Sequence, residues 1–124
     1  NRVRTLRSNR WLLSDGPVAR TSRWGRVVVR AVASHGAQIK LSGMIKIHKQ
    51  AQGTDNFLEL RVLLLDDLSR AVADPQLEIE ANEVKAGHAA SVSKIDEEQI
   101  LYLQSRGLTE LKAKQEIVVG WLGV

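Results

Sequence analysis

Residues 39–48 read IKLSGMIKIH, and residues 57–65 read FLELRVLLL. In the first stretch, polar residues fall between most of the apolar ones, which is close to the period-two alternation of a half-buried β-strand. The second stretch is mostly apolar, ends at the acidic pair Asp66-Asp67 and predicts the next strand. These two stretches decide the fold class, because turn residues and no helical pattern lie between them.

Strand patterns continue on both sides of this pair. Upstream, the β-branched run Val27–Val29 lies between Gly25 and Gly36. Downstream, residues 77–82 read LEIEAN and predict a half-buried strand with an acidic outer face, after a turn at Asp74-Pro75. Such a series of strands is typical of a sandwich, a barrel or a β-solenoid. The lack of a strict short repeat excludes a regular hexapeptide β-helix, and an irregular solenoid remains open.

The period changes after Ser93, where a helical hairpin is predicted. Ser93 with Asp96 three residues later resembles a capping signal for a first helix. Gly107 is suited to end that helix, and Thr109 can cap a second one. The chain is therefore divided into a basic N-terminal arm or incomplete β segment, a β core and a helical hairpin, over residues 1–24, 25–92 and 93–124.

Composition limits the function classes. The chain has 124 residues, of which 44% are hydrophobic and 26% charged, which is ordinary for one globular domain. Its apolar runs are too short to span a bilayer. It has no cysteine, which removes disulfides, a thiolate nucleophile and thiolate metal ligands, and this fits a reducing cytosol. The chain starts at Asn1 rather than Met, which is typical of a trimmed chain or of a fragment.

Charge is unevenly distributed. Residues 1–50 hold eleven Lys or Arg and one acid, whereas residues 51–124 hold seven bases and thirteen acids. A basic half that also carries Trp11 and Trp24 allows an alternative function, a nucleic-acid-binding β domain that uses phosphate contacts and stacking. A solvated basic arm is the simpler interpretation, and we favour it.

Catalytic patterns are missing from the sequence. It contains no phosphate-binding loop, no Gly-x-Ser-x-Gly and no His-Glu-x-x-His. Of the three histidines, His35 and His48 have the context of surface residues. His88 lies among small residues just before the hairpin, so it could ligate iron or another metal, act as a base, or be structural. A standalone enzyme is the weakest hypothesis, because no nucleophile–base pair can be named.

Two segments resemble a known family. Residues 75–96 read PQLEIEANEVKAGHAASVSKID, and residues 101–108 read LYLQSRGL. They are similar to the SufB/SufD family of iron–sulfur cluster assembly proteins, whose members carry a Pro-x-Leu-Glu-Ile strand, a His-x-Ala-Thr/Ser segment and then Tyr-Leu-x-Ser-Arg-Gly. The resemblance covers about residues 25–123.

The resemblance implies a fold and a function. The fold is mainly β, a partial right-handed parallel β-helix followed by a C-terminal α-helical hairpin. The chain would be a cytoplasmic scaffold and not an enzyme. It would pair through the β-helix with a SufB/SufD-like subunit or with itself, and would dock a SufC-type ATPase through its C-terminal helices. It would bind no cofactor tightly alone, although a transient iron–sulfur cluster could form at a subunit interface. Membrane and nucleic-acid partners are not expected.

The same resemblance assigns roles to residues of this chain. His88 and Lys85 would lie at the cluster and subunit interface, with His88 the single candidate metal ligand. The ATPase contact would involve Lys94, Asp96, Tyr102, Ser105, Arg106 and Gly107. SufB-type chains have Glu after the histidine, where Ala89 stands here, so the chain resembles the SufD side more, or an ancestral-like or degenerate member. SufD-like chains commonly have Cys at the position of Ala86. Because members of the family are much longer, this chain would be a C-terminal portion.

Overall fold

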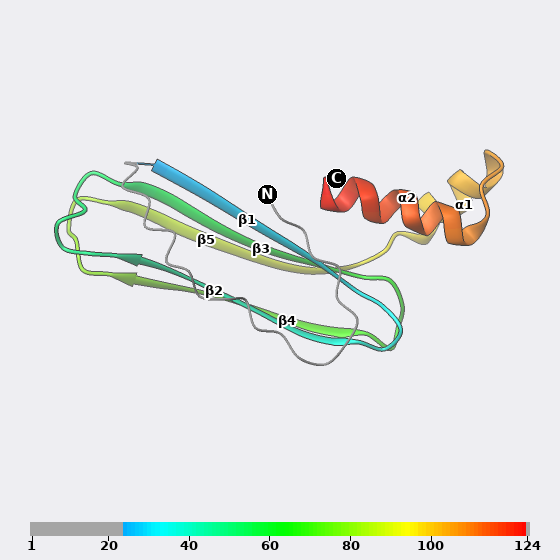
Figure 1. The fold of residues 1–124 in the computed structure, drawn as a ribbon, viewed down its shortest axis with the longest axis horizontal. Helices are drawn as coiled ribbons and strands as arrows, with labels where there is room; N and C mark the ends of the chain where they lie inside the picture. The colour runs from blue at the N-terminus through cyan, green and yellow to red at the C-terminus, as the bar shows by residue number, and fades with distance from the viewer. Residues whose placement is uncertain (1–23, 124) are drawn as a thin grey trace.

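The computed structural model describes residues 24–123 and consists of five strands followed by two helices (Figure 1). Each strand is ten residues long. The elements are β1 (Trp24–Ala33), β2 (Gln38–Ile47), β3 (Asp55–Leu64), β4 (Arg70–Ile79), β5 (Lys85–Lys94), α1 (Glu97–Ser105) and α2 (Glu110–Leu122). A mainly β chain with a C-terminal helical hairpin is therefore confirmed.

The chain alternates between two parallel sheets. One sheet has the strand order β1-β3-β5, and the other consists of β2 and β4. Trp24 pairs with Asp55, and Asp55 pairs with Lys85, so the chain returns to the first sheet in register after each visit to the second. Parallel strands need a long crossover connection. In this chain each crossover passes through a strand of the opposite sheet (Figure 1).

The core lies between the two sheets. Leu58, Leu60 and Val62 of β3 face inward and are almost fully buried. They pack with Leu41 of β2 in one cluster, against which partly buried side chains such as Ile45 also pack. Burial of each such side chain is worth about 1.5–3 kcal/mol. The central strand β3 therefore contributes more apolar stabilisation than any other described element, because it holds the most buried apolar side chains.

The predicted turn at Asp74-Pro75 is wrong, because both residues lie within β4. Proline has no N–H to donate, but an edge strand can accommodate it. Strand β4 pairs only with β2 among the described residues, so Pro75 lies in an edge strand.

The two helices begin and end at side-chain and glycine signals. Asp96 caps α1 by accepting a hydrogen bond from the Glu98 N–H at 2.9 Å, and Thr109 caps α2 by accepting one from the Lys112 N–H at 3.2 Å. The predicted cap at Ser93 is wrong, because β5 continues to Lys94. Gly107, which follows the end of α1, has a φ of 99°. This positive φ is the left-handed backbone conformation that commonly terminates an α-helix and that glycine adopts easily.

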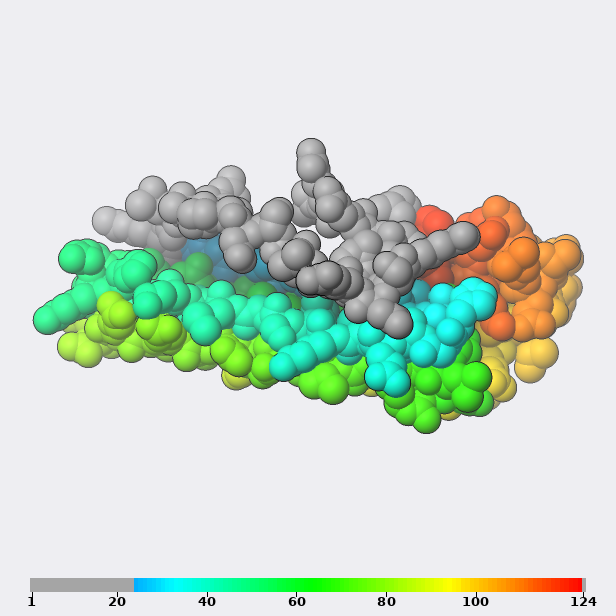
Figure 2. Space-filling view, turned by 60° about the horizontal axis from the view of Figure 1, so that its bottom comes forward, coloured from blue at the N-terminus to red at the C-terminus, as the bar shows by residue number. Residues whose placement is uncertain are grey.

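The helical hairpin lies at one end of an elongated body (Figure 2). Helix α2 packs near β1, and the Trp121 ring lies against the Arg61 guanidinium of β3. No helix among residues 24–123 is long and apolar enough to cross a bilayer. The basic arm and Trp11 lie outside the described residues.

Candidate functional site

The first candidate site lies on β5, an exposed strand at the edge of its sheet. It pairs with β3 on one side and, within residues 24–123, with no strand on the other. Its sequence, KAGHAASVSK, holds mostly small residues, and seven successive residues from His88 to Lys94 are exposed. An edge strand of this kind presents unpaired N–H and C=O groups to which another strand can add.

His88 lies on the inward-facing side of β5. It pairs in register with Leu58, whose side chain is buried between the sheets. Although His88 faces inward, it is exposed, because no further strand pairs with the free edge of β5 in the described structure. Its Nδ1 lies 3.0 Å from the Pro75 carbonyl oxygen of β4, so the ring bridges the two sheets.

Lys85 does not converge with His88. The two residues are three positions apart in one strand, so their side chains point to opposite faces. Lys85 is exposed, and its backbone N–H donates to the Thr54 carbonyl at 2.8 Å. The structure therefore places Lys85 and His88 on the same strand, but their side chains do not form one site.

Gly87 precedes the histidine and lies against an aromatic ring. A Cβ at this position would lie 3.0 Å from Phe57 Cδ2. The missing side chain thus allows β5 to pack directly on the Phe57 ring.

A second candidate surface lies at the end of α1. Tyr102 is 57% exposed, and the Arg106 guanidinium carbon lies 5.2 Å from the centre of its ring. The Ser105 hydroxyl donates to the Tyr102 carbonyl at 2.6 Å, and the Gly107 N–H donates to the Gln104 carbonyl at 2.9 Å. Four of the predicted ATPase-contact residues are therefore neighbours at one helix end.

The other two predicted contact residues lie at the opposite end of α1. Lys94 forms an ion pair with Asp67, which holds the pKa of the Asp67 carboxyl below its usual value by hydrogen bonding and by charge. Asp96 is the cap of α1. Both side chains already have partners within the chain.

The turn from β3 to β4 is a polar centre that the sequence analysis missed. The Asp66 carboxylate accepts hydrogen bonds from the backbone N–H groups of His35, Leu68 and Ser69 at 2.6–2.9 Å, and from the Ser69 hydroxyl at 3.0 Å. Desolvation raises the pKa of Asp66, but these hydrogen bonds outweigh it and the pKa lies below its ordinary value. Aspartate directly after a strand is a turn signal, but no sequence feature indicates the contact with His35.

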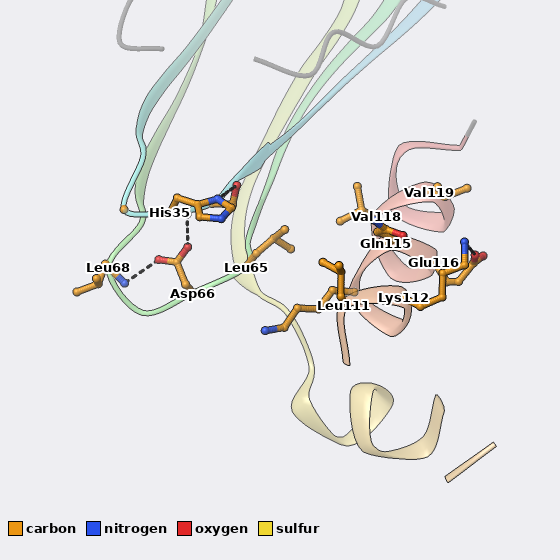
Figure 3. A pocket seen from close by; sticks show the side chains of 13 residues that line it. His35, Leu65, Asp66, Leu68, Leu111, Lys112, Gln115, Glu116, Val118 and Val119 are labelled. Carbon is orange, nitrogen blue, oxygen red and sulfur yellow. Dashed lines mark hydrogen bonds and ion pairs between the residues drawn. The ribbon is translucent and has the colours of Figure 1, made fainter. Parts of the chain in front are cut away.

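A groove of about 750 Å³ separates this turn from α2 (Figure 3). Leu65 and Leu68 line one side, and Leu111, Val118 and Val119 line the other. Leu68 and Leu111 are 76% and 70% exposed. The apolar surface of the hairpin thus continues toward the β-sheets.

Metal-ligating residues do not gather within the described part of the chain. No group of three or more His, Asp or Glu side chains is close enough to hold an ion there, and the whole sequence has no cysteine. His88 can supply one nitrogen ligand. A metal centre that included it would need its other ligands from elsewhere.

The chain crosses repeatedly between two parallel sheets, leaves one edge strand exposed and ends in a helical hairpin. It is therefore one of the mainly β proteins that are built by repeated crossing between two sheets. The chain belongs to the SufBD core domain family of the SUF system for FeS cluster assembly, whose model matches residues 19–121.

Curated relatives support the assignment. One iron–sulfur cluster assembly SufBD family protein of Mycobacterium tuberculosis is 36% identical over 96 residues, which is 77% of this chain and 11% of the relative. A second from the same organism is 46% identical over 82 residues, or 65% of this chain and 21% of the relative. A Mycobacterium leprae member is 45% identical over 82 residues, with the same two shares. The chain therefore spans between a tenth and about a fifth of the length of these relatives.

Proposed function

We propose that this chain is a scaffold portion of a SUF-type iron–sulfur cluster assembly complex. The observation that carries the proposal is strand β5, an exposed edge with His88 at a position open to a second protein. A SufB/SufD-like subunit, or a second copy of this chain, would add a strand to this edge. An iron–sulfur cluster, which is the cargo of such a complex, would then meet His88 and ligands of the partner.

The two sheets form part of a right-handed parallel β-helix in this proposal. Regular alternation between the sheets, with in-register return to each one, is the arrangement that such a coil requires. Residues 25–92 would be the β-helix core, and residues 93–124 a separate docking hairpin. The segment 1–24 would precede the core as a basic arm or an incomplete β segment.

The hairpin would dock a SufC-type ATPase. Exposed apolar and aromatic side chains on α1, Leu101 at 64% and Tyr102 at 57%, support this role. Arg106 stacks on Tyr102 and adds a positive charge beside it. Interface hot spots are enriched in tyrosine and arginine, so this pair is the natural centre of the contact.

The partner would carry out ATP hydrolysis, and this chain would be neither an enzyme nor a holder of a resident cofactor. A cytoplasmic location accords with the SUF system and with a chain that has no cysteine. The nucleic-acid alternative receives little support from residues 24–123. There Arg26 and Arg61 lie at 3.0 and 3.2 Å from the Glu59 carboxylate, and Lys46 is paired with Glu78.

The test is size-exclusion chromatography with light scattering, of the chain alone and mixed with a SufC-type ATPase. We expect co-elution that the double variant Tyr102→Ala/Arg106→Glu abolishes. The matched control is Met44→Ala/Lys40→Glu on β2, since Met44 is 56% exposed and Lys40 is exposed. A folded chain that forms no complex, or a control variant that weakens binding equally, would overturn docking through the hairpin.

A further inference from the structure

The imidazole of His88 is anchored at one of its two nitrogens. Nδ1 lies 3.0 Å from the Pro75 carbonyl oxygen, and a carbonyl oxygen can only accept a hydrogen bond. A neutral imidazole carries one proton, so only the tautomer with that proton on Nδ1 can donate to Pro75. The lone pair of the ring then lies on Nε2.

We propose that the Pro75 carbonyl is a positioning group that selects the Nδ1–H tautomer of His88 and so makes Nε2 the atom offered to iron. This inference rests on the proposed function, in which His88 meets an iron–sulfur cluster at a subunit interface. Metals bind the neutral imidazole through its unprotonated nitrogen. A hydrogen bond from the other nitrogen to a carbonyl fixes both the tautomer and the orientation of the ring.

The strand around His88 leaves this residue exposed. Ala86 and Ala90 are the neighbours of His88 on the same face of β5, and each offers only a methyl group. Across residues 24–123, no strand lies beyond β5 to cover this face. An incoming ligand can therefore approach the ring without displacing a larger side chain of β5.

Pro75 is suited to hold its carbonyl in a fixed place. Its ring locks φ, and β4 is kept in register on β2 with Pro75 opposite Gly43. Alternate N–H groups along β4 face β2, as those of Arg70 and Glu80 do by donating to carbonyls on that side. Position 75 therefore faces away from β2, and a proline there costs no ladder hydrogen bond. The hydrogen bond joins the first residue of the Pro-x-Leu-Glu-Ile pattern to the histidine of the segment that follows. The two separated sequence patterns would therefore act together, by holding the His88 ring in one tautomer.

The experiment is nitrogen NMR of the 124-residue chain labelled with ¹⁵N-histidine, at about pH 9, at which free imidazole is neutral. Long-range proton–nitrogen correlations distinguish a protonated from an unprotonated ring nitrogen. The His88 signals are assigned by their loss in His88→Asn. We expect Nδ1 to resonate as a protonated nitrogen and Nε2 as an unprotonated one. The control is the chain unfolded in urea, where imidazole takes its free preference for the Nε2–H tautomer.

An Nε2–H tautomer in the folded chain, or a mixture like that of the unfolded control, would overturn the proposal. Neither result bears on complex formation, because the light-scattering test reports partner docking and not the proton on His88. Failure of the proposed function and failure of this inference are therefore separable.

Discussion

The Arg61 guanidinium carbon lies 5.4 Å from the centre of the Trp121 ring, so that β3 and α2 meet through a cation–π contact. Arg61 Nε also lies 3.2 Å from a Glu59 carboxylate oxygen, at ion-pair distance although not aligned as a hydrogen bond. Leu63, on the same side of β3 as Arg61, is only 4% exposed. The hairpin is thus attached to the outer face of the sheet and not only through the chain after β5.

Trp121→Ala is expected to lower the free energy of unfolding by about 2 kcal/mol, because it removes a half-buried aromatic ring and its cation–π contact. Trp121→Phe keeps a ring and removes an indole N–H that has no partner among the described residues, so it should stay within about 1 kcal/mol of the original. Urea unfolding measures both. Equal destabilisation by Phe and Ala would show that the indole N–H, and not the ring face, is what matters.

Asp66→Asn should lower the urea midpoint more than Asp67→Asn. The Asp66 carboxylate accepts hydrogen bonds from two turns at once, including the His35 N–H at 2.6 Å, whereas Asp67 pairs with Lys94 on an exposed surface. Surface ion pairs contribute little to stability, while a carboxylate that accepts several hydrogen bonds holds its loop together. The two variants remove the same charge from adjacent positions, so their difference isolates the hydrogen bonds. Equal midpoints would refute this view of the turn.

The lowered pKa of Asp66 predicts how the stability of the chain changes with pH. The pKa of Asp66 in the folded chain is lowered below the unfolded value of about 4, chiefly by hydrogen bonds that outweigh desolvation. Between these two pKa values the unfolded chain binds more protons, so stability rises with pH there. The contribution is complete above the unfolded pKa and is lost as the pH falls through the folded pKa. The gap in urea midpoint between the original chain and Asp66→Asn should therefore shrink from pH 6 toward pH 3; a constant gap would exclude this linkage.

Local patterns predicted the strands and the hairpin, because alternation at residues 39–48 and a capping threonine at Thr109 act within a few residues. Contacts between distant residues could not be predicted in this way. The bond from His88 to Pro75 spans 13 positions and two sheets, and the one from His35 to Asp66 spans 31. The turn predicted at Asp74-Pro75 does not form, because the local turn preference of these residues is overridden by pairing of β4 with β2. The resemblance supplied His88 as a candidate, but only the fold shows which of its atoms is held.

Gly87→Val should destabilise the chain by about 1–3 kcal/mol, because even a Cβ at this position would lie 3.0 Å from the Phe57 ring. Ala89→Val, two residues further along the same face of β5 and exposed, is the matched control and should cost less than about 0.5 kcal/mol. Combining Gly87→Val with Phe57→Leu should recover part of the loss in a double-mutant cycle. Strict additivity of the two substitutions would show that the ring does not cause the strain.

Two variants of Asp96 test whether this residue acts as a helix cap or as a contact with a partner. Asp96→Ala removes the acceptor for the Glu98 N–H and should cost about 1 kcal/mol, whereas Asp96→Asn keeps a capping oxygen and should cost little. Calorimetry or urea unfolding of the chain alone measures this difference. Binding to a SufC-type ATPase gives the second readout. If Asp96 acts only by capping α1, the Asn variant binds as the original does; if its charge faces the ATPase, the Asn variant loses affinity while its stability is retained.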